Sequence, residues 1–316
     1  MPDHCDGAAL TILRLDGGAA HQSCLLRPRT NRSLDTDAWE GGMDHTGDSF
    51  RAFELAGWED PEVVSRYQEH LSHVTRQSIE ALLDEARAGS GLRVLDVASG
   101  SGHIAAAAAR RGAEAIGIDF SLAQVELARK LYPDIDYQQA DAQALPYGDA
   151  SFDAVVNGFG MCHLSDPDAA LREAFRVLRP GGRIAFTVWD APERAVGFGA
   201  VYAAIRAYGS MEVDLPAGPN FFLFSDPNQC RSALQQAGFV APSCRNVPQV
   251  WRFSTPDQLF DALAQGTVRA AATLRAQTPR ARDEIRAVLR GTVAGYMRGS
   301  GFEVPMPAVL AAAVKP

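Results

Sequence analysis

The stretch that decides the fold is residues 94–102, with the sequence VLDVASGSG. An apolar run that contains Asp96 leads into a turn with two glycines, Gly100 and Gly102. An alanine-rich segment follows and favours a helix. A buried strand, a tight turn and a helix N-terminus, in this order, are typical of a site for a nucleotide-like cofactor. Glycine also allows the backbone to approach such a ligand closely.

Strands and helices alternate on either side of this turn. The apolar patterns predict strands at Arg93–Val97, Ala115–Asp119, Asp136–Gln139, Phe152–Gly158 and Arg183–Trp189, with helices at His103–Arg111, after Ser121 and after Asp166-Pro167. Repeated strand–helix units predict an α/β fold with a doubly wound, mostly parallel sheet. Ligands of such sheets bind at the carboxyl ends of the strands.

Further elements are expected before and after this alternation. Helices are predicted from Asp60-Pro61 onward, at Val74–Ala88, Pro227–Ala237, Pro256–Ala276 and Pro279–Gly295, with strands near Val247–Phe253 and at Pro307–Val314. Residues 190–225 are rich in proline and aromatic side chains and do not fit another strand–helix unit. The pattern therefore predicts an insertion after the fifth strand.

These patterns divide the chain into regions. Residues 1–44 mix small and charged residues without periodicity, which predicts a poorly ordered extension. Residues 45–316 are expected to form one domain, with a helical cap at its N-terminal end and a cofactor-binding core over 60–189. The insertion at 190–225 is a candidate cover for the substrate.

Composition excludes several function classes. The chain has 316 residues and a net charge of −8, without the basic face that nucleic-acid binding requires. Its five cysteines form no C-x-x-C pair, so neither a disulfide framework nor a zinc cluster is expected, and no metal-ligand spacing stands out. No apolar run is long enough to span a membrane, and no signal-peptide core begins the chain. We expect a cytoplasmic protein.

Two cofactors are compatible with the glycine turn. The residues from Gly100 to Ala105 satisfy the loose dinucleotide pattern, which would make the chain an NAD-dependent oxidoreductase. However, Asp96 beside the turn would repel a pyrophosphate, whereas it tolerates the ammonium and sulfonium of S-adenosylmethionine (SAM). Asp141 and Ala142 follow the third strand, where they can bond an adenine edge. SAM is therefore favoured, and a catalytically silent SAM-binding protein is a second alternative.

The motifs together resemble those of the class I SAM-dependent methyltransferases, in particular the type 11 branch related to quinone-biosynthesis C-methyltransferases. The matching segments are VLDVASGSG at 94–102, GIDFS at 117–121, ADAQALPY at 140–147, FDAVVNGFGMCHL at 152–164 and LREAFRVLRPGGRIAFTVW at 171–189. The resemblance implies a Rossmann-like sheet of seven strands. It also implies transfer of a methyl group from SAM to a small-molecule acceptor by in-line displacement.

The resemblance also assigns roles to residues. Gly100 and Gly102 would back the methionine part of SAM, with Asp96 beneath it. Asp119 would bind the ribose, Asp141 and Ala142 the adenine, and Asn157 the region near the sulfonium. Ser99 and Phe120 lie in the same motifs and complete the candidate cofactor site, although Ser99 is equally a plain loop residue. Ala98 stands where the family has its first glycine, and its methyl group leaves less room for SAM.

The acceptor site is less defined. His163 follows the fourth strand and is a candidate general base, with a packing or capping role as the alternative. Position alone suggests the other pocket residues, which are Tyr67, Phe159, Met161, Phe221, Phe222 and Trp251. Whether the acceptor atom is oxygen, nitrogen or carbon does not follow from the fold.

Overall fold

The computed structural model describes residues 46–316, so the extension predicted over residues 1–44 lies outside the described residues. A seven-stranded sheet has the order β3-β2-β1-β4-β5-β10-β6. Its strands are β1 (Arg93–Val97), β2 (Glu114–Asp119), β3 (Asp136–Gln139), β4 (Phe152–Gly158), β5 (Leu178–Trp189), β6 (Val240–Val247) and β10 (Ala308–Val314). The first five are parallel, and β10 runs antiparallel to both β5 and β6. The mostly parallel α/β sheet is thus confirmed.

Consecutive side chains of the central strands enter two different cores. On β1, Val94 packs into one apolar cluster and Leu95 into the other, and neither is exposed to solvent. Val155 and Val156 on β4 divide in the same way. Because both faces are covered, these strands read as continuous apolar runs instead of alternating patterns.

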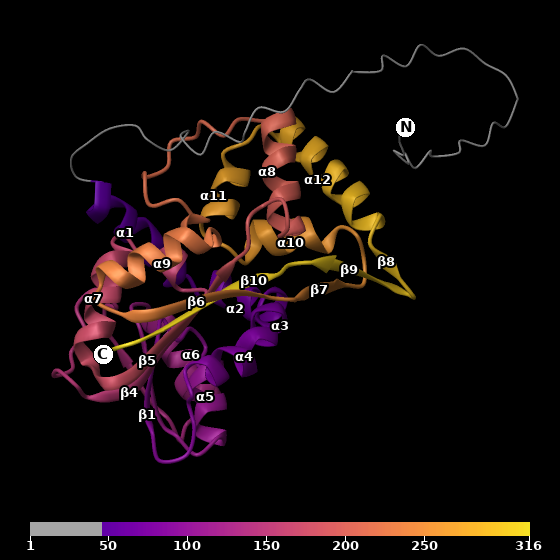
Figure 1. Ribbon diagram of the computed structural model, residues 1–316. Helices are drawn as coiled ribbons and strands as arrows, with labels where there is room; N and C mark the ends of the chain where they lie inside the picture. Colours follow the sequence, from indigo (N-terminus) through magenta and orange to yellow (C-terminus); the bar gives the residue numbers. More distant parts are fainter. Residues whose placement is uncertain (1–45) are drawn as a thin grey trace, which may run out of the picture. The chain divides into compact units, whose positions relative to one another are not determined.

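Helices cover both faces of this sheet (Figure 1). Buried residues of α4 (Ile79–Glu85) belong to one core together with Ala107 and Ala108 of α5 (His103–Arg110), and those of α7 (Pro167–Val177) and α9 (Pro227–Gln236) belong to the other. Two residues that precede predicted helices act as their N-caps. The Ser121 hydroxyl accepts from the Gln124 amide at the start of α6 (Leu122–Leu131), and Asp166 caps α7 through the Ala169 amide.

The N-terminal helical region differs from the prediction in two ways. A helix that the sequence did not suggest, α1 (Thr46–Trp58), precedes the expected α2 (Pro61–His70). The single helix predicted over Val74–Ala88 is instead broken into α3 (Ser72–Thr75), a 3-10 turn η1 (Arg76–Ser78) and α4. Hydroxyls of Ser72, Thr75 and Ser78 bond back to main-chain carbonyls there and compete with regular helix hydrogen bonds.

The fold carries two insertions. The first, after β5, contains α8 (Val196–Tyr208) and the turn η3 (Leu223–Ser225). The second lies between β6 and β10 and was not predicted as an insertion. It comprises β7 (Val250–Phe253), α10 (Gln258–Gln265), α11 (Arg269–Arg275), α12 (Pro279–Ala294), β8 (Met297–Arg298) and β9 (Gly301–Pro305).

The second insertion forms a small sheet of its own, with the order β7-β9-β8. The strand predicted near Val247–Phe253 is confirmed as β7, which begins three residues later, whereas β6, in the other sheet, was not predicted. The helix predicted over Pro256–Ala276 is instead two helices, and α10 ends at Gln265 with Gly266 as its C-cap. Helix α12 packs along α8, so the two insertions meet (Figure 1).

Candidate cofactor and acceptor site

One cavity of about 1040 Å³ lies where strands β1, β2 and β4 end. Helices α1 and α2 contribute to its wall from the N-terminal side. The structure brings together in its lining many of the residues that the sequence singled out, namely Tyr67, Ala98, Ser99, Gly100, Asp119, Phe120, Asp141, Ala142, Phe159 and His163. Asp96, Gly102 and Asn157 lie outside the lining and act on it indirectly.

The glycine turn has a strained start and an obligatory glycine at its end. Gly102 has φ +81°, and a Cβ there would lie 2.3 Å from the Tyr137 hydroxyl oxygen. Ala98 has φ +53°, in the left-handed region that costs an L-residue with a side chain roughly 1–2 kcal/mol. The Ala98 methyl group also lies close to Gly160. A Cβ added at Gly160 would lie 2.6 Å from the Cβ of Ala98.

Three amides at this turn are bonded within the chain. The Gly100 amide donates to Asp119 Oδ2 (2.8 Å), the Gly102 amide to the Ser99 carbonyl (2.9 Å), and the Ala105 amide to Asp96 Oδ2 (2.9 Å). A pyrophosphate binds through amides at such a turn, and these three are not available to it.

Asp96 supports the turn from below. Its side chain is completely buried, and its Oδ1 has no hydrogen-bond partner among the described residues. Burial raises the pKa of this carboxyl to about 8; the Ala105 amide opposes the shift, and the charge of Asp119 adds to it. Through Oδ2, Asp96 holds the N-terminus of α5, which makes it a support of the turn.

Asp119 ends β2 with its carboxylate fixed at the cavity. Its Oδ1 accepts from the Ser121 amide (3.0 Å) and its Oδ2 from the Gly100 amide. Burial raises its pKa to about 6, although both amides oppose the shift. Each oxygen retains a lone pair, so the carboxylate is an oriented acceptor for ligand hydroxyls.

Asp141 lies beside the next strand and is held by a residue that the sequence did not suggest. Arg51 of α1 forms an ion pair with Asp141 Oδ2 (2.7 Å) and itself lines the cavity. The other oxygen accepts from the Gln143 amide (2.9 Å). The amide of Ala140 donates to the Asp119 carbonyl, so the chain carrying Asp141 runs beside the end of β2.

Asn157 shapes the loop after β4. Its side-chain amide donates to the Val97 carbonyl (2.9 Å), and its Oδ1 accepts from the amides of Gly160 (3.0 Å) and Met161 (3.1 Å). These bonds hold Phe159 at φ +61°, with its ring 4.4 Å from that of Trp189. Asn157 is therefore a support of the cavity wall and does not line it.

His163 belongs to a buried cluster of charges, here called the Glu54 cluster, which comprises Glu54, Trp58, His163 and Arg269. The Glu54 carboxylate is completely buried and accepts from Trp58 Nε1 (3.2 Å), His163 Nδ1 (2.8 Å) and Arg269 Nε (2.8 Å). Burial alone would raise the pKa of Glu54, but His163 and Arg269 lower it.

The same cluster determines the protonation of His163. Burial alone would lower the pKa of its imidazole, but the neighbouring Cys162 sulfur and the Glu54 carboxylate raise it to about 10. The ion pair with Glu54 therefore favours the protonated form of His163. In this form the imidazole has no lone pair free to accept a proton, as a general base would need to.

Polar contacts of Gln68 with Ser101 and His103, here called the latch, join α2 to the glycine turn. Gln68 Oε1 accepts from the Ser101 hydroxyl (2.9 Å) and lies 3.1 Å from His103 Nε2. His103 Nδ1 is 2.7 Å from the Tyr132 hydroxyl. Burial lowers the pKa of His103 to about 4, so this imidazole is neutral.

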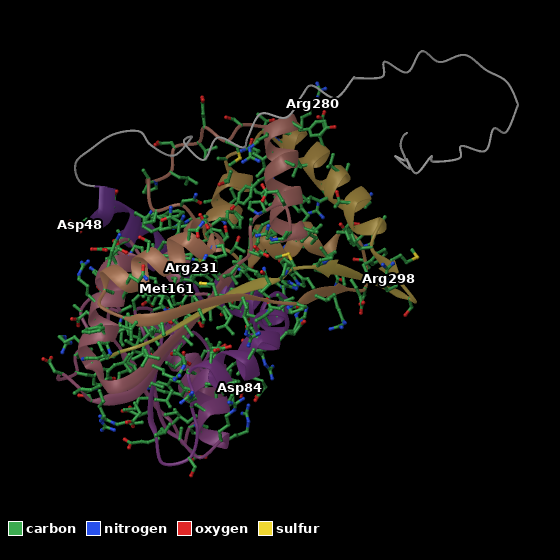
Figure 2. The ribbon with its side chains drawn as sticks, viewed as in Figure 1. Asp48, Asp84, Met161, Arg231, Arg280 and Arg298 are labelled. Atoms are coloured by element: carbon green, nitrogen blue, oxygen red, sulfur yellow. The ribbon has the colours of Figure 1, made fainter. Side chains whose placement is uncertain are left out.

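Four residues expected in the acceptor pocket lie outside the main cavity. Trp251 is buried in the core and donates to the His70 carbonyl (2.8 Å). Met161 and Phe221 line a separate cavity of about 220 Å³, and Phe222 packs against Phe221 with ring centroids 5.0 Å apart. Figure 2 shows Met161 among packed side chains, whereas Arg298 extends from the β8 end.

Comparison with known proteins identifies the family. A methyltransferase-domain family model matches residues 95–186. The demethylmenaquinone methyltransferase of Clavibacter sepedonicus is 42% identical over 176 residues, which cover 50% of this chain and 69% of that protein. The chain belongs to the class I SAM-dependent methyltransferases. The segment shared with the family model includes the glycine turn, Asp119, Asp141 and His163.

Two further relatives match the chain over different lengths. The chain is 39% identical to the demethylmenaquinone methyltransferase of Renibacterium salmoninarum over 118 residues, which cover 37% of the chain and 50% of the relative. An uncharacterized protein of Mycobacterium tuberculosis is 42% identical over 185 residues, covering 57% and 65%. The chain thus spans half to two thirds of the length of these relatives.

A solved structure supports the same fold. The phosphoethanolamine N-methyltransferase 2 of Haemonchus contortus, in complex with SAM, aligns with a TM-score of 0.53 at 19% identity. The alignment covers 85% of this methyltransferase and 60% of the other chain.

Several residues of the site were not predicted from the sequence. Arg51, Glu54 and Trp58 lie on α1, a helix that was not predicted, although Glu54 and Trp58 are four residues apart and so share a face. Arg269 is 215 residues from Glu54, and no sequence pattern links the two. Among the described residues, no group of three or more His, Cys, Asp or Glu could hold a metal, and no helix has the length and apolarity to cross a bilayer.

Proposed function

We propose that this methyltransferase binds SAM at the ends of β1, β2 and β3 and transfers its methyl group to a small molecule. The observation that carries the proposal is the placement of two carboxylates, Asp119 and Asp141, beside the Gly100 backbone in one cavity. Carboxylates at these positions suit the hydroxyl and amino donors of a nucleoside. A nucleoside without a pyrophosphate also suits a turn in which the amides of Gly100 and Gly102 are bonded internally.

The residues present fit SAM in further respects. The Ser99 hydroxyl lines the cavity and has no hydrogen-bond partner among residues 46–316. At Gly100 the nearest atom to an added Cβ would be 3.8 Å away, so a ligand can approach this backbone. Arg76 also lines the cavity, and its guanidinium forms no hydrogen bond or ion pair within the described region.

Each residue then has a defined task. Asp119 would accept from the ribose hydroxyls, Asp141 and Ala142 would bind the adenine edge, and Arg76 would bind the carboxylate of the methionine part. When bound, SAM supplies an electrophilic methyl group on a cationic sulfur. The protein aligns the acceptor and excludes water, with Tyr67 and Phe159 as apolar walls.

Calorimetric titration tests the cofactor. We expect SAM and S-adenosylhomocysteine to bind the full chain, and NADH not to bind. Binding of NADH without binding of SAM would contradict the proposal and favour an NAD-dependent oxidoreductase.

A turnover assay separates an enzyme from a silent binding protein. S-adenosylhomocysteine formation is measured with a panel of small acceptors that includes demethylmenaquinol, because the relatives carry that name. Methylation of any panel member supports the proposal. SAM binding without turnover across the panel would favour a silent protein.

A further inference from the structure

We propose that the methyl acceptor carries an anionic oxygen, as a carboxylate or an ionised phenol or enol, and that this oxygen binds against His163. This inference rests on the proposed function, because it takes the cavity to hold both the methyl donor and the acceptor. It specifies the chemical class of the acceptor, which the fold alone does not.

The charges of the Glu54 cluster do not balance. Glu54 supplies one negative charge between two cations, Arg269 and His163. The other titratable groups that interact with His163 are the adjacent Cys162 and the Asp119 carboxylate across the cavity. Asp119 offsets part of this charge from across the cavity, but its oxygens bond to the amides of Gly100 and Ser121 and form no hydrogen bond with His163. An anion bound at the open side of the cluster would give the second cation a direct partner.

The open side of the cluster is His163. The guanidinium of Arg269 is bonded within the protein, since it donates to Glu54, to the Cys162 carbonyl (2.8 Å) and to the Pro219 carbonyl (3.0 Å). His163 uses Nδ1 for Glu54, lines the cavity and has a side chain that is 22% exposed. Because Glu54 takes Nδ1, Nε2 is the ring nitrogen that remains for a ligand.

The surroundings of His163 favour a planar acceptor. Its ring is held edge-on by Trp58, at a centroid distance of 5.1 Å, and by Phe221 at 6.0 Å. The cavity wall beside it includes Phe159 and Leu164. Flat apolar walls around one charged donor suit an aromatic or enolic anion.

An ionised acceptor also removes the need for a base. With oxygen as the acceptor atom, its lone pair forms the bond to the methyl carbon while the carbon–sulfur bond breaks and leaves its electron pair on sulfur. No proton has to be removed in this step. This agrees with a cavity in which the candidate base, His163, is held as a cation by Glu54.

Calorimetry on the S-adenosylhomocysteine complex of the full chain tests the inference, with 2-naphthoate and the neutral 2-naphthamide as a matched pair of probes. One charge-assisted hydrogen bond predicts at least ~10-fold tighter binding of the acid. Equal binding, or tighter binding of the amide, would overturn the inference. Failure of S-adenosylhomocysteine itself to bind would instead contradict the proposed function.

Two variants test which residue causes the preference for the acid over the amide. His163→Gln is expected to abolish the preference for the acid, whereas His73→Gln, at an exposed histidine outside the cavity, is expected to keep it. A preference that survives in His163→Gln would place the anion elsewhere and reject the inference. In case His163→Gln does not fold, 4-nitrophenol binding to the wild type provides a second readout. Its absorbance must shift towards the phenolate on binding, and a shift towards the phenol contradicts the inference.

Discussion

Ala98 holds a left-handed backbone conformation at the start of the glycine turn, although its side chain makes that conformation unfavourable. We expect Ala98→Gly to raise the free energy of unfolding by about 1 kcal/mol, since relief of this strain exceeds the added chain entropy of glycine. Urea unfolding measures the change.

A second alanine provides the control for this prediction. Ala150 has φ +52° and is exposed, outside the cavity. Ala150→Gly should give a similar gain in stability without altering SAM affinity, whereas Ala98→Gly should alter both. A loss of stability in both variants would show that positive φ is not a source of strain at these positions.

Asp119 is the cofactor residue with the clearest expected effect. Asp119→Ala removes an oriented acceptor, so SAM binding should weaken by about 1–3 kcal/mol. Calorimetry measures this loss, with Asp134→Ala as the control because Asp134 is exposed and outside the cavity. Unchanged affinity in Asp119→Ala would contradict the assignment of the ribose site.

Asp96 makes stability depend on pH. Its pKa of about 8 in the folded state lies above the unfolded value, so the folded protein binds this proton more tightly. Its contribution to stability is therefore full below about pH 4 and is lost as pH rises to about 8, by up to about 1.4 kcal/mol per pH unit. Asp96→Asn should flatten this part of the urea-unfolding profile, and an unchanged profile would assign it to other groups.

Individual residues were predictable where a short motif fixes their place. Asp119 and Asp141 follow strands of clear apolar pattern, and parallel strands bring their carboxyl ends to one edge. The roles of Asp96 and Asn157 were harder to predict, because both side chains bond to main-chain groups whose positions depend on the loop conformation. The cation at His163 depends on Glu54, which belongs to an element that the sequence did not reveal.

At the scale of elements, the latch between α2 and the glycine turn depends on Gln68. Gln68→Ala leaves the Ser101 hydroxyl and His103 Nε2 without their shared acceptor. We expect SAM to bind ~10-fold more weakly, through faster dissociation, because α2 then covers the cavity less firmly. Stopped-flow dissociation measures this rate.

The matched control for the latch is Glu69→Ala. Glu69 neighbours Gln68 on the same helix, but its side chain is 57% exposed and pairs only with exposed or partly exposed groups. Its dissociation rate should equal that of the wild type. Equal rates for Gln68→Ala and Glu69→Ala would show that the latch does not control the cofactor.

The elements that were predicted correctly are those with local signals. Strands β1, β3 and β4 matched to the residue, because apolar runs and flanking turns define them. Strand β6 and the strands β8 and β9 of the small sheet were missed, whereas β7 was predicted with a shifted start. Most of β6 is exposed at the sheet edge, so its sequence lacks the apolar signal of the inner strands.

At the scale of the whole molecule, Glu54 joins parts that are distant in sequence. Its carboxylate links α1 to the loop after β4 and to α11 of the second insertion. Glu54→Gln leaves two buried cations without their counter-charge, so we expect a loss of about 3–5 kcal/mol in the free energy of unfolding. Urea unfolding by fluorescence of the four tryptophans measures it.

An exposed ion pair provides the comparison. Glu303 pairs with Arg252 at 3.0 Å, with side chains 41% and 62% exposed. Glu303→Gln should cost less than about 1 kcal/mol. Similar losses in the two variants would show that burial of Glu54 contributes nothing beyond an ordinary ion pair.

The position of β10 has a consequence for the order of assembly during synthesis. This strand is the last in the chain, yet it lies between β5 and β6, and β6 has no other neighbour in the sheet. On a ribosome that adds roughly 5–20 residues per second, β6 therefore waits for some 60 further residues before it can pair. Throughout that interval the nascent chain exposes the edge of β5, and chaperones that recognise unpaired strands have time to bind it.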